Sequence, residues 1–203
     1  MATVIHSFAL SGVNAYSVTV EAVTLHGQPS VNIVGMGDTA VKEAAHRLEA
    51  SLTYGRFEFP KLKVVINLAP SGVKKSGSHF DLAMAVSLLQ EAGQILVDPE
   101  MLSDSAFIGE LSLNAELRPV SGVLPMVIAA RESGMKRLFV PIGNYREASL
   151  VKGLDIYAFK SLVEVVDYYR GNMSISLRSL KKWNDYSIPM RALTLPMFEG
   201  KMC

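Results

Sequence analysis

The amino-acid sequence predicts an α+β fold in which helices pack on a mixed β-sheet. The first 34 residues form a pattern of three short strands joined by tight turns. Residues 61–89 have the pattern of a buried strand, a glycine loop and a buried helix, and residues 105–171 alternate between short strands and helices. A doubly wound nucleotide-binding sheet does not begin with three strands in succession, so that class is not expected.

The three N-terminal strands are predicted from alternating hydrophobicity. They cover Thr3 to Leu10, Tyr16 to Leu25 and Ser30 to Val34, with turns at 12–14 and 26–29. Because both connections are short, we expect the three strands to form an antiparallel meander.

A helix is predicted from about Thr39 to Leu52, with Asp38 as its N-terminal cap. The residues expected on its buried stripe are Val41, Ala45, Leu48 and Leu52, and those on its solvated side are Lys42, Glu43, His46, Arg47 and Glu49. Because no Cys or second His lies at ligand spacing from His46, no metal site is expected there.

The rest of the chain is expected to pack around residues 61–89. The run from Lys61 to Leu68 is rich in Val, Ile and Leu, and predicts a central strand that ends at Pro70. Ser78 is predicted to cap the next helix, with Asp81 three residues later completing an approximate capping box. The segment FDLAMAVSLL is apolar on nearly every face, so this helix should lie between two layers.

Shorter elements are predicted downstream, and Ser121 is expected to cap the first long helix among them. In chain order they are a helical turn at 98–102, a strand at 105–111, a hairpin around 113–117, a helix from Ser121 to Gly134, a strand at 137–140, a helix at 144–151, a strand at 155–159 and a last helix opened by Ser161 and Glu164.

Composition sets limits on domain number, partners and location. The chain has 203 residues, of which 49% are hydrophobic, so we expect one domain over residues 1–171 and an extended tail over 172–203. A net charge of +1 argues against a chain dominated by a polyanion-binding surface, but permits a local basic patch. A single Cys at position 203 and the lack of a long apolar run predict a cytoplasmic protein without a membrane partner.

Two glycine motifs were tested as nucleotide sites. Residues 35–40 have the spacing G-x-G-x-x-A, but two hairpin strands precede them and the next strand ends in Asn67-Leu68 rather than in an acid. A tight turn followed by a helix cap is therefore favoured there. Residues 72–77 have the G-x-x-x-x-G spacing of a P-loop, but Ser78 and His79 replace the required Lys and Ser or Thr, so ATP binding is not expected.

Longer blocks of the sequence resemble a known family. VGMGDTAVKEAAHRLEASL, INLAPSGVKKSGSHFDLAMA, FIGELSLNAELRPVSGVLPM and GMKRLFVP, which occur in this order between about Thr3 and Gly171, are similar to the N-terminal domain of the ComM (YifB) magnesium-chelatase-like ATPases. The same region resembles the proteolytic domain of Lon. The resemblance implies a fold like that of the Lon C-terminal domain and of ribosomal protein S5 domain 2.

The Lon resemblance also implies where a protease site would lie. The nucleophilic Ser would fall at His79 and its Lys partner at Leu124, so neither required side chain is present. A Ser–Lys dyad needs a neutral lysine to take the hydroxyl proton, and leucine cannot do this. We therefore expect no peptidase activity, with a degenerate serine hydrolase that uses Ser76 or Ser78 as an alternative.

The ComM resemblance implies a hexameric ATP-driven motor tied to DNA branch migration during uptake and recombination in bacteria. The leading expectation is a non-catalytic domain that contacts DNA or helps ring assembly. The candidate phosphate contacts are Lys74, Lys75, Ser76 and His79, together with the amides at the helix N-terminus. The alternatives are that these lysines are merely solvated, or that the domain only mediates subunit packing.

The sequence contains no Walker A loop, so any ATP and Mg²⁺ would belong to the ATPase module of the family. That module would begin near residue 172. Since the core matches the family and the tail does not, we expect a truncated or frameshifted product.

Overall fold

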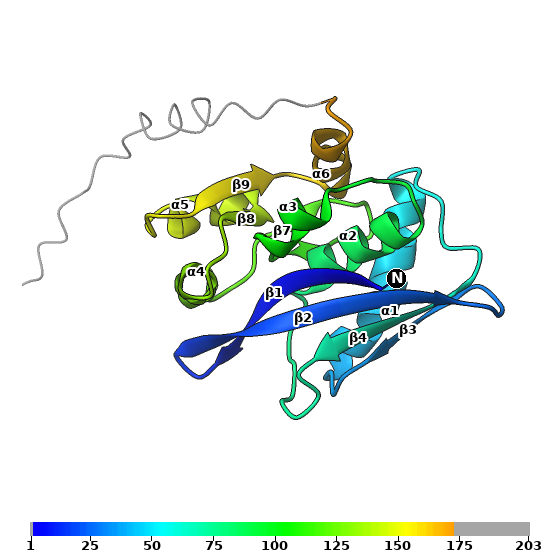
Figure 1. Ribbon diagram of the computed structural model, residues 1–203, viewed down its shortest axis with the longest axis horizontal. Helices are drawn as coiled ribbons and strands as arrows, with labels where there is room; N and C mark the ends of the chain where they lie inside the picture. The colour runs from blue at the N-terminus through cyan, green and yellow to red at the C-terminus, as the bar shows by residue number, and fades with distance from the viewer. Residues whose placement is uncertain (1, 173–203) are drawn as a thin grey trace, which may run out of the picture. The chain divides into compact units, whose positions relative to one another are not determined.

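The computed structural model describes residues 2–172, which form a seven-stranded mixed sheet with helices packed on it (Figure 1). The strand order is β3-β4-β2-β1-β5-β8-β9, and β6 and β7 form a separate two-stranded sheet. This arrangement confirms the predicted α+β class.

The elements lie close to their predicted positions. The strands are β1 (Thr3–Ser11), β2 (Asn14–Leu25), β3 (Ser30–Val34), β4 (Lys63–Ala69), β5 (Ser105–Phe107), β6 (Glu110–Leu111), β7 (Leu117–Arg118), β8 (Arg137–Pro141) and β9 (Asp155–Phe159). The helices are α1 (Thr39–Tyr54), α2 (Asp81–Glu91), α3 (Pro99–Ser103), α4 (Val123–Glu132), the 3-10 turn η1 (Ile142–Asn144), α5 (Tyr145–Ala148) and α6 (Leu162–Tyr169).

The predicted antiparallel meander is correct for two strands and wrong for the third. β1 and β2 form an antiparallel hairpin, but the strand that pairs with the other edge of β2 is β4. β3 lies beyond β4 and runs parallel to it, because α1 carries the chain back to the start of β4.

Strand β4 was predicted to be central, and this is wrong: it lies second from the edge of the sheet. Its residues alternate in burial, with Val64, Ile66 and Leu68 buried and the residues between them partly exposed. The apolar run was typical of a strand buried on both faces, but Val65 points away from the core and remains partly exposed.

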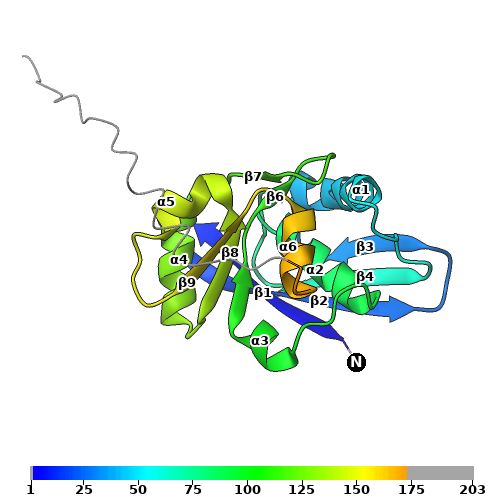
Figure 2. The ribbon, with the colours of Figure 1, turned by 90° about the horizontal axis from the view of Figure 1, so that it is seen from above.

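Helix α2 is buried along almost its whole length, as predicted for a helix between two layers. Every residue from Asp81 to Leu89 is buried, and the helix contacts β1, β2 and α1 (Figure 2). An apolar surface on all sides is therefore what this position requires. The loop before α2 is held between this helix and β4.

The strands on the other side of β1 pack against the second half of the chain. β1 pairs parallel with β5, and β5, β8 and β9 continue in parallel. Phe8, Ala106 and Leu138 from these strands share a core with Val127 and Ala130 of α4. Phe107, Phe139 and Phe159 pack together with the tyrosines of α6, with ring centroids of Phe107 and Phe139 at 4.6 Å.

Asp38 caps α1 as predicted, because its carboxylate accepts a hydrogen bond from the Val41 N–H at 3.0 Å. Ser161 likewise caps α6. The caps predicted at Ser78 and Asp81 for α2 and at Ser121 for α4 are wrong: among the described residues neither helix has a hydrogen bond to its N-cap side chain, and the Leu124 N–H of α4 donates to Glu147 at 2.9 Å instead.

The reason is local in each case. Helix α4 begins after Gly122, whose φ of 72° and close approach to Leu10 require glycine, so Ser121 lies one residue too early. In α2 the first N–H groups bond to backbone carbonyls instead.

The tail expected over residues 172–203 lies outside the described residues except for Asn172. Among residues 2–172, no helix is both long enough and apolar enough to cross a membrane.

Candidate functional site

The glycine loop between β4 and α2 is held against the turn between β3 and α1. The Lys75 N–H donates to the Met36 carbonyl at 3.1 Å, and the Asp38 N–H donates to the Lys75 carbonyl at 2.9 Å. Asp38 also accepts from the Gly77 N–H at 3.2 Å through the carboxylate oxygen that does not cap α1. One aspartate therefore fixes both the start of α1 and the loop.

The glycines of the earlier motif have structural roles at this turn. A Cβ on Gly35 would lie 2.3 Å from the Leu68 carbonyl oxygen, and one on Gly37 would lie 2.4 Å from Cγ1 of Val41. Both positions need glycine for close packing. This supports the tight turn that was favoured over a dinucleotide site.

Lys75 is not available at the surface, which contradicts its selection as a phosphate contact. Its side chain is buried, and Nζ donates to the Pro70 carbonyl within the same loop. Burial lowers the pKa of the Lys75 ammonium. Of the two loop lysines, only Lys74 is exposed, as is Ser76 beside it.

His79 is also buried, with 8% of its surface exposed, so it cannot serve as an exposed phosphate contact. Its ring packs on Phe80 with centroids 4.1 Å apart, and its Nε2 has no hydrogen-bond partner within residues 2–172. Burial lowers the pKa of His79 to about 4, although the nearby Asp38 carboxylate opposes this shift. The imidazole is therefore neutral at pH 7.

The N-terminus of α2 does not present free amides to the loop surface. The Asp81 N–H donates to the Ser78 carbonyl at 3.1 Å, and the Leu82 N–H donates to the Gly109 carbonyl at 3.0 Å. The buried carboxylate of Asp81 lies in the same turn. The Asp81 and Leu82 amides are therefore not free to hold a phosphate.

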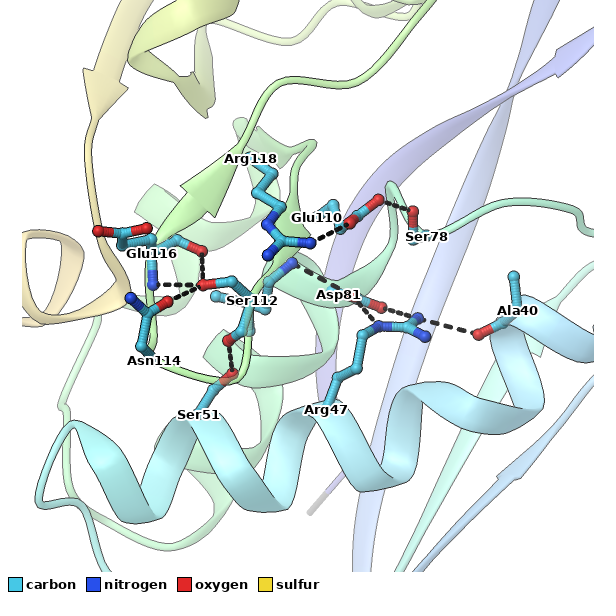
Figure 3. Close-up of polar contacts among 11 residues, drawn as sticks. Ala40, Arg47, Ser51, Ser78, Asp81, Glu110, Ser112, Asn114, Glu116 and Arg118 are labelled. Atoms are coloured by element: carbon cyan, nitrogen blue, oxygen red, sulfur yellow. Dashed lines mark hydrogen bonds and ion pairs between the residues drawn. The ribbon is translucent and has the colours of Figure 1, made fainter.

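Arg47, predicted to lie on the solvated side of α1, instead forms an ion pair with Asp81 (Figure 3). Its Nε and Nη2 atoms donate to the two carboxylate oxygens at 2.7 and 2.9 Å, and the Leu111 N–H donates to the same group at 3.2 Å. Burial raises the pKa of Asp81 to about 6, while Arg47 and the Leu111 amide oppose that rise. The pair joins α1, α2 and β6.

A second polar group lies on the other side of the α2 N-terminus. The Ser78 hydroxyl donates to the Glu110 carboxylate, whose other oxygen lies 3.7 Å from Nη1 of Arg118 (Figure 3). Glu110 was not predicted from the sequence, because its partner Ser78 is 32 residues away and no motif connects the two. Ser78 thus bonds to a side chain rather than capping the helix.

Ser78 and Glu110, but not Arg118, line a cavity of about 340 Å³. Its polar lining residues come from the glycine loop, from Glu110 and from Ser121. Its apolar lining residues are Leu10, Pro119 and Val120. The lining residues are Leu10, Ser76, Gly77, Ser78, His79, Glu110, Pro119, Val120 and Ser121.

The two positions implied for a protease dyad do not form one. His79 has a neutral buried ring, and Leu124 packs against the core that α4 shares with the sheet. Neither side chain can act as a serine nucleophile or as its lysine base.

The fold and the site together define an α+β domain of the class found in the Lon proteolytic domain and in ribosomal protein S5 domain 2, without the Ser–Lys pair of the protease at the two compared positions. The family profile described as "Subunit ChlI of Mg-chelatase" matches residues 20–144, and the chain belongs to this family.

Relatives with curated sequences agree with this assignment. The chain is 34% identical to "Competence protein ComM" of Haemophilus influenzae over 174 residues, which are 86% of this chain and 34% of the relative. It is 35% identical over 151 residues to "Uncharacterized protein YifB" of Escherichia coli, covering 74% of this chain and 29% of the relative. "Lon protease 2" of Bacillus subtilis is 34% identical over 100 residues, 48% of this chain and 17% of the protease. The chain spans about a third of the length of its ComM and YifB relatives.

Proposed function

We propose that this chain corresponds to the non-catalytic N-terminal domain of a ComM-like ATPase of the magnesium-chelatase type. Such an ATPase would process DNA in competence and recombination. The role of this domain is to help assemble the subunits of a hexameric ring. ATP and Mg²⁺ would act in the ATPase module of such a machine and not in this domain.

The observation that carries this proposal is that the polar groups of the glycine loop form hydrogen bonds within the domain. The donors of the loop and of the α2 N-terminus are bonded to four acceptors, which are Asp38, the Pro70 carbonyl, Glu110 and the Gly109 carbonyl. A loop fixed in this way is suited to present a rigid surface to another subunit. The two positions of the protease dyad hold His79 and Leu124, which do not support catalysis.

DNA contact is a second candidate role, because Lys74 and Ser76 are exposed on the loop. Lysine contacts to phosphate make binding weaker as salt rises. The carboxylates of Asp38 and Glu110 lie close to the same loop and oppose the approach of a polyanion.

Of Ser76 and Ser78, the two candidates for the hydrolase alternative, Ser78 is the better one, since its hydroxyl donates to the Glu110 carboxylate. Hydrolysis of a peptide or ester that disappears in Ser78→Ala would favour it. An equal rate in the wild type and the variant would exclude Ser78 as a nucleophile.

The test measures self-association and DNA binding in the full chain. Sedimentation at increasing protein concentration should show oligomers without DNA, and fluorescence anisotropy should show no salt-sensitive binding of single-stranded, duplex or branched DNA. A monomer at every concentration would contradict assembly by this domain alone.

The matched variants for DNA binding are Lys74→Ala and Lys152→Ala, which remove exposed lysines from two different loops. Salt-sensitive binding that is lost only in Lys74→Ala would place a DNA contact on the glycine loop and favour the second role.

A further inference from the structure

The cavity beside the glycine loop is lined by groups that accept hydrogen bonds. Three serines, His79 and Glu110 are among its lining residues, together with the apolar Leu10 and Pro119. Glu110 is the one charged residue among these lining residues. A polar cavity of this size, with an apolar wall and a few convergent polar groups, has the properties of a small-ligand site.

Arg118, the cation nearest to Glu110 among the described ion pairs, holds it weakly. The nitrogen–oxygen distance is 3.7 Å, beyond hydrogen-bond length, and 62% of the Arg118 side chain is exposed. Such an exposed pair contributes little free energy. Arg118 does not line the cavity, so the carboxylate is available to a second cation from the cavity side.

His79 lines the cavity, but its Nε2 atom is buried and is not part of the accessible wall. His79 is more than nine-tenths buried and its Nε2 has no partner among the described residues. The ligand contacts argued for this cavity are therefore those of Glu110 and the serines, and not Nε2 of His79.

We propose that this cavity binds a guanidinium or ammonium group, which donates hydrogen bonds to Glu110 and to the serine oxygens around it. The planar guanidinium of an arginine side chain suits a carboxylate flanked by hydroxyls, because it carries five donors and no acceptor. The inference goes beyond the assembly role, since it assigns a ligand chemistry to a defined cavity.

Two small probes of the same shape test the charge requirement. Butylguanidinium should bind the full chain saturably by calorimetry or by chemical-shift changes at His79, and the neutral isostere butylurea should bind at least about tenfold more weakly. Equal binding of the two probes, or no saturable binding of butylguanidinium, would overturn the proposal.

Substitutions at Glu110 and at Arg118 should change the affinity for butylguanidinium in opposite directions. Glu110→Gln should reduce butylguanidinium affinity about tenfold or more, because it removes the charge while keeping the shape. Arg118→Ala should increase affinity about two- to fivefold, because it removes a competing cation. Weaker binding in Arg118→Ala would contradict the proposed competition.

Control variants keep this test independent of folding and of assembly. Ser121→Ala changes a cavity wall outside the ion pair and should weaken binding, whereas Lys152→Ala should leave it unchanged. Circular dichroism confirms folding for each variant. Probe binding by a chain that stays monomeric would contradict assembly while supporting the cavity site.

The source of the cation is tested with a capped Gly-Arg-Gly peptide and with spermidine. Preference for the peptide would indicate a side chain from a protein partner, and preference for spermidine a free polyamine; either supports the shared chemistry. Failure of both to compete with butylguanidinium would contradict it.

Discussion

Two arginine–carboxylate pairs flank the N-terminus of α2, and they differ in almost every physical property. Arg47 and Asp81 meet at 2.7 Å with side chains that are 19% and 0% exposed. Arg118 and Glu110 lie 3.7 Å apart with side chains that are 62% and 28% exposed. The first pair has two direct hydrogen bonds, and the second has no contact of hydrogen-bond length between the two residues.

This difference shows that the same two chemical groups form a tight buried pair or a loose exposed one, depending on their burial. Asp81 cannot reach water, so it depends on Arg47 and the Leu111 amide. Glu110 reaches both solvent and the cavity, so its arginine can be displaced at little cost.

The largest effect is expected for Arg47→Met. It leaves the Asp81 carboxylate buried without its cation, and should lower the free energy of unfolding by about 3–5 kcal/mol in a denaturant titration. The double variant Arg47→Met/Asp81→Leu should recover much of this loss, because both charges are then removed. Arg131→Met, at an exposed arginine of α4, is the matched control and should cost under about 1 kcal/mol.

His79 should make stability fall in acid. Its pKa is about 4 in the folded chain and 6.5 in the unfolded one, so the unfolded chain binds more protons between these values. The stabilisation is complete above pH 6.5 and is lost as pH falls to about 4, by on the order of 3 kcal/mol.

The comparison variant for this pH test is His79→Leu, which lacks the acid-side loss caused by His79, so wild-type stability should fall relative to that of the variant as pH drops from 6.5 to about 4. Asp81 contributes in the opposite direction, since burial raises its pKa from 3.8 to about 6 and its ionisation then costs stability as pH rises. Because Asp81 is present in both chains, the difference between their profiles isolates His79. Parallel profiles would contradict the assigned neutral ring.

A smaller loss is expected for Asp38→Ala. It removes the α1 cap and the acceptor of the Gly77 N–H, so unfolding free energy should fall by about 1–2 kcal/mol. Asp38→Asn keeps an oxygen acceptor and should lose less. Hydrogen exchange at Gly77 should quicken in the alanine variant, and unchanged exchange would show that the loop is held without this contact.

The smallest effect is expected for Arg118→Ala, which should change unfolding free energy by less than about 1 kcal/mol. A loss as large as that of Arg47→Met would show that the two pairs are energetically alike. The contrast in burial would then not explain their roles.

Much of the fold followed from sequence patterns that are local. The α2 segment FDLAMAVSLL indicated a helix buried on all sides, and the tight-turn interpretation of Gly35 and Gly37 agrees with their packing. The position of β3 beyond β4 did not follow, because strand pairing depends on where α1 directs the chain and not on the pattern within each strand.

The site was less predictable than the fold. Lys75 has the same charge as Lys74, and only the folded loop places its ammonium on the Pro70 carbonyl. Arg47 occupies a polar stripe of α1, yet its partner Asp81 lies 34 residues away. Such contacts depend on tertiary packing, which neither helical spacing nor a short motif encodes.

The sheet order also has a consequence for the order in which the chain can fold. β1 pairs on one edge with β2, its neighbour in sequence, and on the other with β5, which begins only at Ser105. During synthesis the β1 hairpin can form early and can add β4 once residue 69 has emerged. The second edge of β1 then stays open until β5 is made. An unpaired edge is a place where chains associate wrongly, so slow elongation between residues 69 and 105 should favour aggregation of the nascent chain.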